Sequence, residues 1–381
     1  MKKALMMASV ASMIDLFNMD NIEILKSLGY EVDVACNFEN GSITSQDRVD
    51  EFKKELEEAK HKVHHLPIPR TIFAIREVIA SYKIMKKICS TTNYEIVHCH
   101  SPIGGIIARF ACRELRKNGT KVIYTAHGFH FFKGAPIKNW VIYYMAERIS
   151  ANFTDLLITI NREDYKNAQK FNAKKIEYVP GIGIDVQQIK STSIDIVEKR
   201  SEFGFKEEDF IIFTAGQLSK RKNQEVLIKA LATIDNKRVK LLICGLGELE
   251  EYLMELVKQL GLESRVHLAG YRRDVVELLH MVDCFAFPSL QEGLPVALME
   301  SMAAGLPVVC SQIRGNVDLI ENEVNGYIVH PDDINGFTEA FNKIISNEII
   351  KIGMSNNNLK MVKKYDKSHI RNKMWEIYCN V

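Results

Sequence analysis

Short apolar runs alternate with amphipathic segments along most of this chain. The runs have the length and continuous hydrophobicity of buried parallel strands, and the segments between them, such as 21–29 and 109–119, have helical spacing. The expected strands are 3–9, 31–36, 62–66, 95–100, 121–127 and 155–160 in the first half, and 210–216, 240–245, 265–270, 283–289 and 306–311 in the second. This order predicts the α/β class, with a doubly wound parallel sheet in each half.

The alternation pauses at the sequence VPGIGID (179–185). Its two glycines and one proline favour a hinge over a helix or a strand. A chain of 381 residues is also longer than one core normally accommodates and suits two domains. We therefore expect two Rossmann-like domains, 1–182 and 183–366, facing each other across a cleft, with ligands beyond the carboxyl ends of the strands.

The composition is that of an ordinary globular protein, with 46% hydrophobic and 26% charged residues. The formal net charge of +2 conceals an asymmetry, because residues 1–190 contain 27 Lys and Arg against 21 Asp and Glu. Residues 191–381 contain 23 Lys and Arg against 27 Asp and Glu. The basic first half favours an anionic acceptor or a membrane surface, but its excess of charge is too small to predict nucleic-acid binding.

Neither the cysteines nor the opening residues indicate an exported protein. The eight cysteines have no C-x-x-C spacing and mostly lie in apolar runs, as expected for buried thiols in a reducing compartment. Residues 1–17 combine two lysines with an apolar run, as a signal peptide does, but the first domain needs a strand here and we favour the strand. No apolar run reaches the length of about 20 residues that a membrane-spanning helix requires.

The stretch FPSLQEGLPVALMESMAAGLPVV (287–309) contains two acids in apolar surroundings, Glu292 and Glu300. Pro295 suits the first position of a helix, and the later Gly-Leu-Pro ends it, which predicts a helix at about 295–304. Glu292 then lies in the loop before this helix and Glu300 lies on it. A buried carboxylate needs a partner, and none is close in sequence, so we favour a polyhydroxylated ligand over a purely structural role.

Basic residues follow the expected strand at 210–216. Gly216 begins a turn, and the cations come where a helix should start: Lys220, Arg221 and Lys222. Helix N-termini and cationic side chains both attract phosphate, although a solvated surface run is the alternative. After the next strand, Gly245 and Gly247 would permit a ligand to approach the backbone closely.

Histidines follow two strands of the first half: His98, His100, His127 and His130. The H-x-H pair could ligate zinc, but no neighbouring Asp or Glu completes a site, so we expect no metal and favour hydrogen bonding to substrate or backbone. His127 is the best candidate for contact with a reacting group. The aromatic segment 128–147 that follows is either interior packing or a surface that rests on a membrane and admits a lipid-linked acceptor.

The run DCFAFPSLQEGLPVALMESMAAGLPVVCS, continued by NGYIVHPDD, resembles the retaining nucleotide-sugar glycosyltransferases of family 4, whose two glutamates are separated by seven residues. The resemblance extends through HCHSPIGG, TAHGFHFFKGAP, GQLSKRKN and GYRRDVVELLHMVD, and is closest to the bacterial exopolysaccharide and capsule branch. It implies the GT-B fold, with the nucleotide on the second domain and the acceptor on the first. It also implies that the C-terminal helix (367–381) crosses back onto the first domain.

The resemblance assigns roles in the donor site. Glu292 would contact the hydroxyls of the donor sugar near the reacting carbon, and Gly293 and Leu294 would offer backbone N–H groups. Glu300 would bind the ribose, and the backbone around Tyr271 and Arg272 would meet the base. Lys222, helped by Arg221, would neutralise the diphosphate, and Gly216 would also contact it. His127 would lie next to the sugar on the acceptor side, where His98 and His100 are further candidates.

Two positions depart from the family pattern: Gln217 replaces the usual arginine, and the first loop (8–15) lacks glycine. The chain contains no D-x-D motif, so we expect a metal-independent enzyme without a cofactor. Breaking the sugar–diphosphate bond leaves negative charge on the phosphate, which the cations and the helix N-terminus would stabilise. Attack on the same face as the departing phosphate is our working hypothesis for retention.

The function expected from the resemblance is transfer of a sugar from a UDP-sugar to a glycan acceptor linked to polyprenyl diphosphate, during cell-surface polysaccharide synthesis. The enzyme would be cytoplasmic, bound peripherally to the inner face of the cell membrane, with no nucleic-acid partner. A UDP-sugar epimerase of similar build is the main alternative. A periplasmic type of sugar-binding protein is a second, and a Rossmann dehydrogenase is disfavoured because no G-x-G-x-x-G follows the first strand.

Overall fold

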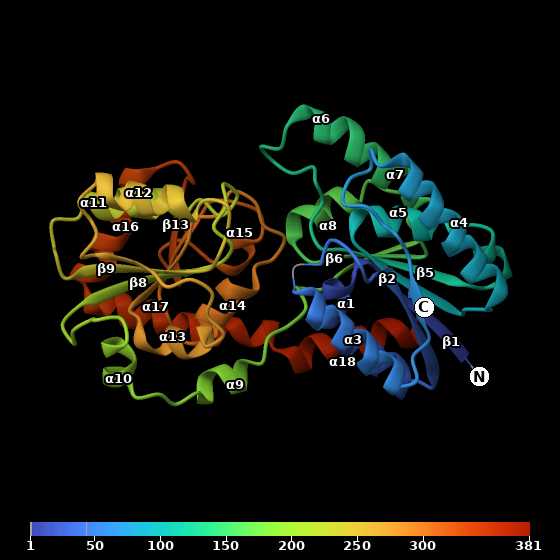
Figure 1. Ribbon diagram of the computed structural model, residues 1–381, viewed down its shortest axis with the longest axis horizontal. Helices are drawn as coiled ribbons and strands as arrows, with labels where there is room; N and C mark the ends of the chain where they lie inside the picture. Colours follow the sequence, from blue (N-terminus) through green and yellow to red (C-terminus); the bar gives the residue numbers. More distant parts are fainter. Residues whose placement is uncertain (1, 43) are drawn as a thin grey trace. The chain divides into compact units, whose positions relative to one another are not determined.

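The computed structural model describes residues 2–42 and 44–381, so Met1 and Ile43 lie outside the described residues. The chain forms two compact units (Figure 1). The first contains residues 1–182 together with 368–381, and the second contains residues 183–367. The division therefore falls inside the glycine-rich segment 179–185, and the C-terminal residues from Ser368 onward belong to the first unit.

In the described part of the first unit, seven parallel strands form a sheet in the order β3-β2-β1-β4-β5-β6-β7. The strands are β1 (Lys2–Val10), β2 (Tyr30–Asn37), β3 (Val63–His65), β4 (Ile96–His100), β5 (Lys121–Ala126), β6 (Leu156–Thr159) and β7 (Lys175–Tyr178). The helices are α1 (Ala11–Phe17), α2 (Met19–Ser27), α3 (Gln46–Glu58), α4 (Ile75–Thr91), α5 (Pro102–Ala111), η1 (Leu115–Asn118), α6 (Ile137–Asn139), η2 (Trp140–Tyr144), α7 (Met145–Ala151), α8 (Arg162–Ala168) and α18 (Lys367–Cys379).

In the second unit, six parallel strands form a sheet in the order β10-β9-β8-β11-β12-β13. The strands are β8 (Phe210–Ala215), β9 (Val239–Cys244), β10 (Val266–Leu268), β11 (Cys284–Phe287), β12 (Val308–Ser311) and β13 (Gly326–Val329). The helices are α9 (Val186–Ser191), α10 (Ile196–Ser201), α11 (Gln224–Ala232), α12 (Glu250–Gln259), α13 (Val275–Met281), α14 (Val296–Ala303), α15 (Asn316–Leu319), α16 (Ile334–Ser346), α17 (Glu348–Met361) and η3 (Val362–Tyr365).

The predicted fold class is confirmed, because both units are parallel sheets with intervening helices. In each sheet the strand order reverses once, between β1 and β4 in the first unit and between β8 and β11 in the second. Loops that leave the carboxyl ends of the two strands at such a reversal diverge, and ligands bind in the crevice between them. The sheet order therefore predicts one ligand crevice between the loops after β1 and β4, and another between the loops after β8 and β11.

Some elements differ from the sequence predictions. The edge strand β7 was not expected, since it pairs with β6 along one edge only and its sequence KIEY includes two charges. The helix predicted at 109–119 is largely wrong, because α5 begins at Pro102 and ends at Ala111. Two glycines concealed this helix, and at least one is needed for packing, since a Cβ atom on Gly105 would lie 2.4 Å from the ring of Tyr124.

The helix α18 belongs to the core of the first unit. Its apolar side chains Ile370, Met374, Ile377 and Tyr378 are buried in one cluster with residues of β1, β2 and α2. Their spacing places all four on one face of the helix. Burial of this face stabilises the position of α18 on the sheet.

Seven of the eight cysteines are buried, as predicted for inert thiols, but Cys379 at the end of α18 is exposed. The prediction for Cys379 was wrong because the helix turns this position away from its apolar face. Every helix among the described residues falls short of the combined length and hydrophobicity that a membrane crossing requires.

Candidate functional site

The two glutamates of the 287–309 stretch lie at the sheet reversal of the second unit. β8 and β11 are paired neighbours, and Glu292 lies in the loop that leaves β11. The helix after this loop, α14, occupies Val296–Ala303 rather than 295–304, and Pro295 precedes it in an extended conformation. Most of α14 is buried, as its apolar sequence predicted: Leu298, Met299, Ser301, Met302 and Ala303.

The carboxylate of Glu292 is held by two cations from the loop after β8. Its Oε1 accepts hydrogen bonds from Arg221 Nη1 and from Lys222 Nζ, both at 2.8 Å. Arg221 Nη1 also donates to the carbonyl of Gln291 at 3.0 Å, and the backbone of Glu292 accepts from Arg314 Nε at 3.0 Å. Among the described residues, Glu292 Oε2 has no such donor, so this oxygen is the one available to a ligand.

Lys222 is the more enclosed of the two cations. Its side chain is 15% exposed, against 44% for Arg221, and its Nζ lies 4.7 Å from the ring centroid of Phe287. Burial lowers the pKa of Lys222, and the charge of Glu292 opposes that effect. An ammonium group in this position interacts strongly with an anion, because water screens it little.

Asn223 is a residue of this loop that the sequence analysis missed. It has a positive φ of 55°, and its side-chain Nδ2 donates to the carbonyls of Pro288 at 3.2 Å and Pro331 at 2.9 Å. These carbonyls follow β11 and β13 respectively. An Asn directly before a predicted helix was the available signal, but it normally indicates a helix cap rather than a bridge between loops.

Glu300 lies on α14 and is half-buried. Burial raises the pKa of its carboxyl group. Within residues 2–42 and 44–381, its carboxylate forms no hydrogen bond or ion pair. A half-buried carboxylate without a partner is energetically costly unless a ligand supplies hydroxyl donors.

The remaining predicted donor residues have varied surroundings. Gly293 and Leu294 lie between Glu292 and the start of α14, and Gly216 ends β8 next to the side chain of Lys222. Tyr271 is 67% exposed. The guanidinium of Arg272 is paired with Asp274, with Nε 2.8 Å from Oδ1. The side chain of Arg272 is therefore occupied, and its backbone is the part that a base could contact.

Gly245 and Gly247 are closely approached by protein backbone. A Cβ atom on Gly245 would lie 1.9 Å from the carbonyl oxygen of Gly216, and one on Gly247 would lie 2.1 Å from that of Leu218. These glycines permit the loop after β9 to pack against the loop after β8. A side chain at either position would therefore collide with the backbone of the loop after β8.

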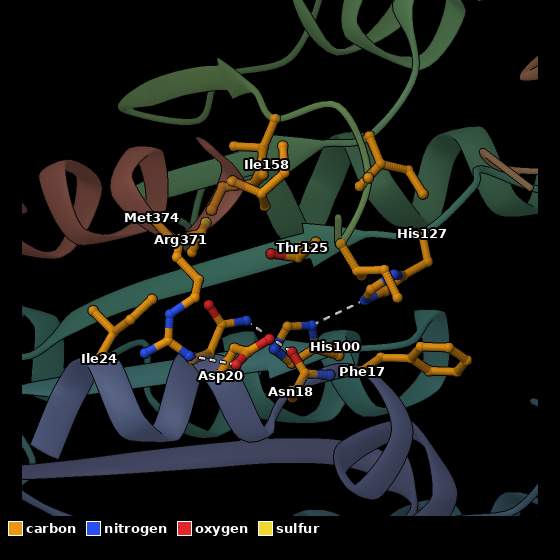
Figure 2. A pocket seen from close by; sticks show the side chains of 16 residues that line it. Phe17, Asn18, Asp20, Ile24, His100, Thr125, His127, Ile158, Arg371 and Met374 are labelled. Carbon is orange, nitrogen blue, oxygen red and sulfur yellow. Dashed lines mark hydrogen bonds and ion pairs between the residues drawn. The ribbon is translucent and has the colours of Figure 1, made fainter. Parts of the chain in front are cut away.

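The histidines of the first unit form a row at the ends of β4 and β5. His100 Nδ1 and His127 Nε2 are 3.0 Å apart and share a hydrogen bond (Figure 2). His98 Nδ1 is 2.6 Å from the hydroxyl of Tyr378, and its Nε2 is 2.8 Å from Thr125 Oγ1. Burial lowers the pKa of His98 to about 3 and that of His127 to about 4, so both rings are neutral at physiological pH.

Of the three predicted residues, His127 and His100 line a cavity of about 40 Å³, but His98 does not. His98 is not positioned to contact an acceptor. It is buried, and both of its ring nitrogens are hydrogen-bonded, to Tyr378 and Thr125. Arg371 of α18 also lines the cavity and pairs with Asp20 of α2 (Figure 2). It pairs in addition with Glu23 of the same helix. In the described chain, no group of three or more His, Cys, Asp or Glu residues is arranged to hold a metal ion.

The aromatic segment 128–147 contains both buried aromatic side chains and exposed apolar side chains. Phe129 and Phe131 are buried and stack at 4.6 Å between ring centroids. The continuous helix formed by α6, η2 and α7 has a second, exposed face with the apolar side chains Ile137, Val141, Met145 and Ile149. These side chains are four residues apart and form one stripe.

The chain is similar to known glycosyltransferases over most of its length. Residues 195–365 match the family described as glycosyl transferases group 1, and residues 7–161 match the family described as glycosyl transferase 4-like. The putative glycosyltransferase EpsD of Bacillus subtilis (strain 168) is 35% identical over 348 residues, which cover 90% of this chain and 87% of that protein. The UDP-Gal:alpha-D-GlcNAc-diphosphoundecaprenol alpha-1,3-galactosyltransferase of Escherichia coli is 28% identical over 367 residues, covering 92% and 90%.

Solved structures show the same architecture. Anabaena Alr3699/HepE in complex with UDP has a TM-score of 0.79 at 20% identity, with both chains covered completely. WaaG, a glycosyltransferase involved in lipopolysaccharide biosynthesis, has a TM-score of 0.71 at 17% identity, with 98% and 99% covered. The fold is thus that of GT-B glycosyltransferases, with two Rossmann-like domains.

Proposed function

Because this chain belongs to the glycosyltransferases with group 1 and 4-like domains, we propose that it transfers a sugar from a UDP-sugar to a lipid-linked glycan acceptor during cell-surface polysaccharide synthesis. The UDP donor is supported by the solved relative in complex with UDP. The lipid-linked acceptor is supported by the name of the E. coli galactosyltransferase, whose acceptor is a diphosphoundecaprenol.

The observation that carries this proposal is the asymmetric environment of Glu292. One carboxylate oxygen is bound by Arg221 and Lys222, and the other faces no protein donor in the described residues. A sugar bears hydroxyl donors that suit the second oxygen, while its diphosphate bears oxygens that suit the two cations. One site can thus hold both ends of the bond that breaks.

The chemistry requires stabilisation of the diphosphate as it leaves. Lys222 and Arg221 supply positive charge, and the low exposure of Lys222 makes its charge more effective than it would be in water. With these cations in place, the proposed mechanism does not depend on a metal ion. We further propose retention of anomeric configuration, with the acceptor hydroxyl attacking on the face that the phosphate leaves and passing its proton to a phosphate oxygen.

The rest of the donor would extend along the second unit. The unpartnered carboxylate of Glu300 suits the two hydroxyls of a ribose, and the nucleobase would meet the backbone around Tyr271 and Arg272. Gly293 and Leu294 would donate their backbone N–H groups to the sugar or phosphate. His127 on the first unit would hydrogen-bond the sugar or the acceptor as a neutral imidazole, since burial lowers its pKa to about 4.

The exposed stripe of Ile137, Val141, Met145 and Ile149 suits an acceptor that resides in a bilayer. We propose that this face of α6, η2 and α7 rests on the anionic inner face of the cell membrane. Its apolar side chains would enter the lipid, and the neighbouring exposed cations, Lys133, Lys138 and Arg148, would meet the lipid phosphates. The relatives described above are named as glycosyltransferases, so the epimerase alternative gains no support from them.

A panel of nucleotide sugars would test the proposal by release of nucleotide, with and without an acceptor linked to polyprenyl diphosphate. Wild type should release UDP only in the presence of lipid acceptor. Glu292→Ala should abolish this turnover, and Glu300→Ala should raise the KM for the donor by about tenfold, because a ribose partner is lost. Conversion of a UDP-sugar without acceptor would indicate an epimerase, and failure to bind any nucleotide sugar would refute the proposal.

A further inference from the structure

Three consecutive residues of the loop after β8 are tied to the loop after β11. Arg221 accepts a hydrogen bond at its carbonyl from the backbone N–H of Leu290 at 2.8 Å. Lys222 binds Glu292, and Asn223 binds the carbonyl of Pro288. Lys222 therefore lies between two residues that are each hydrogen-bonded to the backbone of the loop after β11.

Asn223 has an unusual conformation for a residue with a side chain. Its φ of 55° and ψ of 36° are left-handed, a region that L-residues other than Asn, Asp and Gly seldom adopt. It precedes α11 as the capping residue, yet its side chain makes no cap hydrogen bond. The amide instead donates both of its protons, one to Pro288 O and one to Pro331 O. The side chain has therefore exchanged a helix cap for a bridge between loops.

From this geometry we infer that Asn223 is a positioning residue for Lys222, an inference that rests on the proposed donor site. The left-handed turn ends the loop directly after Lys222, and the amide fixes that turn to the ends of β11 and β13. On its other side, Lys222 is fixed by the bond from its N–H to the carbonyl of Ser219 at 2.9 Å. Lys222 thus projects from a short segment that is anchored at both ends.

Position 223 requires a residue that adopts a left-handed backbone conformation and donates two side-chain hydrogen bonds. The short amide side chain of Asn meets both requirements. Glycine would adopt the same backbone conformation but would lose both hydrogen bonds. Aspartate has the same shape and tolerates the left-handed region, but its carboxylate would face two carbonyl oxygens and could donate to neither. Alanine would lose the bonds and would also strain the backbone.

The experiment measures UDP binding by calorimetry, together with thermal stability, for Asn223→Gly and Asn223→Asp. Both should weaken UDP binding, Asn223→Asp by about tenfold or more, because Lys222 is no longer held in place. Asn357→Asp is the matched control, since Asn357 Nδ2 also donates to a carbonyl, that of Val324 at 2.8 Å, from the exposed face of α17. This control should bind UDP as wild type does.

A double-mutant cycle separates positioning from a general structural role. Lys222→Met alone should weaken UDP binding, and adding Asn223→Gly should weaken it little further, because both changes act on one interaction. Fully additive losses, or unchanged UDP affinity in a folded Asn223→Asp protein, would overturn the inference. Wild type that binds no UDP would instead refute the proposed function itself. If one variant does not fold, the other still decides the outcome.

Discussion

Arg109 and Glu147 form a buried ion pair that should be the most sensitive point in the first unit. Arg109 on α5 is fully enclosed, and its Nη2 is 2.8 Å from Glu147 Oε2 on α7. Its Nε donates to the carbonyl of Gly105 at 2.9 Å, and its guanidinium lies 3.9 Å from the ring centroid of Tyr124. The Tyr124 hydroxyl donates in turn to Glu147 Oε1 at 3.0 Å.

We predict that Arg109→Met strongly destabilises the first unit. The substitution retains most of the apolar volume, so the main loss is the charge opposite Glu147, which is itself 4% exposed. Leaving a buried charge without its partner costs about 3–5 kcal/mol. For a unit of this size each kcal/mol lowers the melting temperature by about 2–4 °C, so a fall of about 6–20 °C is expected.

Differential scanning calorimetry at neutral pH would measure the effect. The double substitution Arg109→Met with Glu147→Leu should restore most of the stability, because no charge is then left buried; the hydroxyl of Tyr124 and the carbonyl of Gly105 each lose one hydrogen bond. The control is Lys117→Met, which removes the exposed pair between Lys117 and Glu114 and should leave the melting temperature close to that of wild type, because water screens this pair. A fall of less than about 2 °C for Arg109→Met, or a double variant less stable than the single one, would refute this reasoning.

Three further outcomes are expected. Glu292→Gln should lose transfer but bind UDP about threefold more tightly than wild type, because the Glu292 carboxylate that competes with the diphosphate for two cations is removed. Weaker UDP binding in calorimetry would contradict this. Val141→Glu should reduce sedimentation with anionic vesicles without changing UDP binding. Ile349→Glu, which changes another exposed residue, should sediment as wild type does. Equal effects of the two substitutions would contradict the proposed membrane contact. Since burial lowers the pKa of His98 to about 3 and of His127 to about 4, while unfolded histidine titrates near about 6.5, the unfolded state binds more protons between these values. Stability should therefore be complete above about pH 6.5 and fall in acid by about 1.4 kcal/mol per pH unit for each ring; a melting temperature that does not change between pH 7 and pH 5 would contradict this.

Hydrophobic periodicity alone determined the alternation of strands and helices, because each element buries a face that its own sequence displays. Where it failed, the cause was local. The edge strand β7 carries charges, and the glycines of α5 concealed a helix that needs one of them to pack against Tyr124. The spacing of Glu292 and Glu300 around a helix that follows Pro295 likewise identifies that stretch as a candidate site from sequence alone.

The partners of these residues were decided only by the tertiary structure. Glu292 meets Lys222 across 70 positions of sequence, and His98 meets Tyr378 across 280. No periodicity links such residues, since the order of strands in each sheet alone determines which loops become neighbours. The left-handed turn at Asn223 is stable only when two other loops present their carbonyls to its amide. The sequence thus contained the chemistry of this site, and the long-range packing of its loops determined which groups face one another.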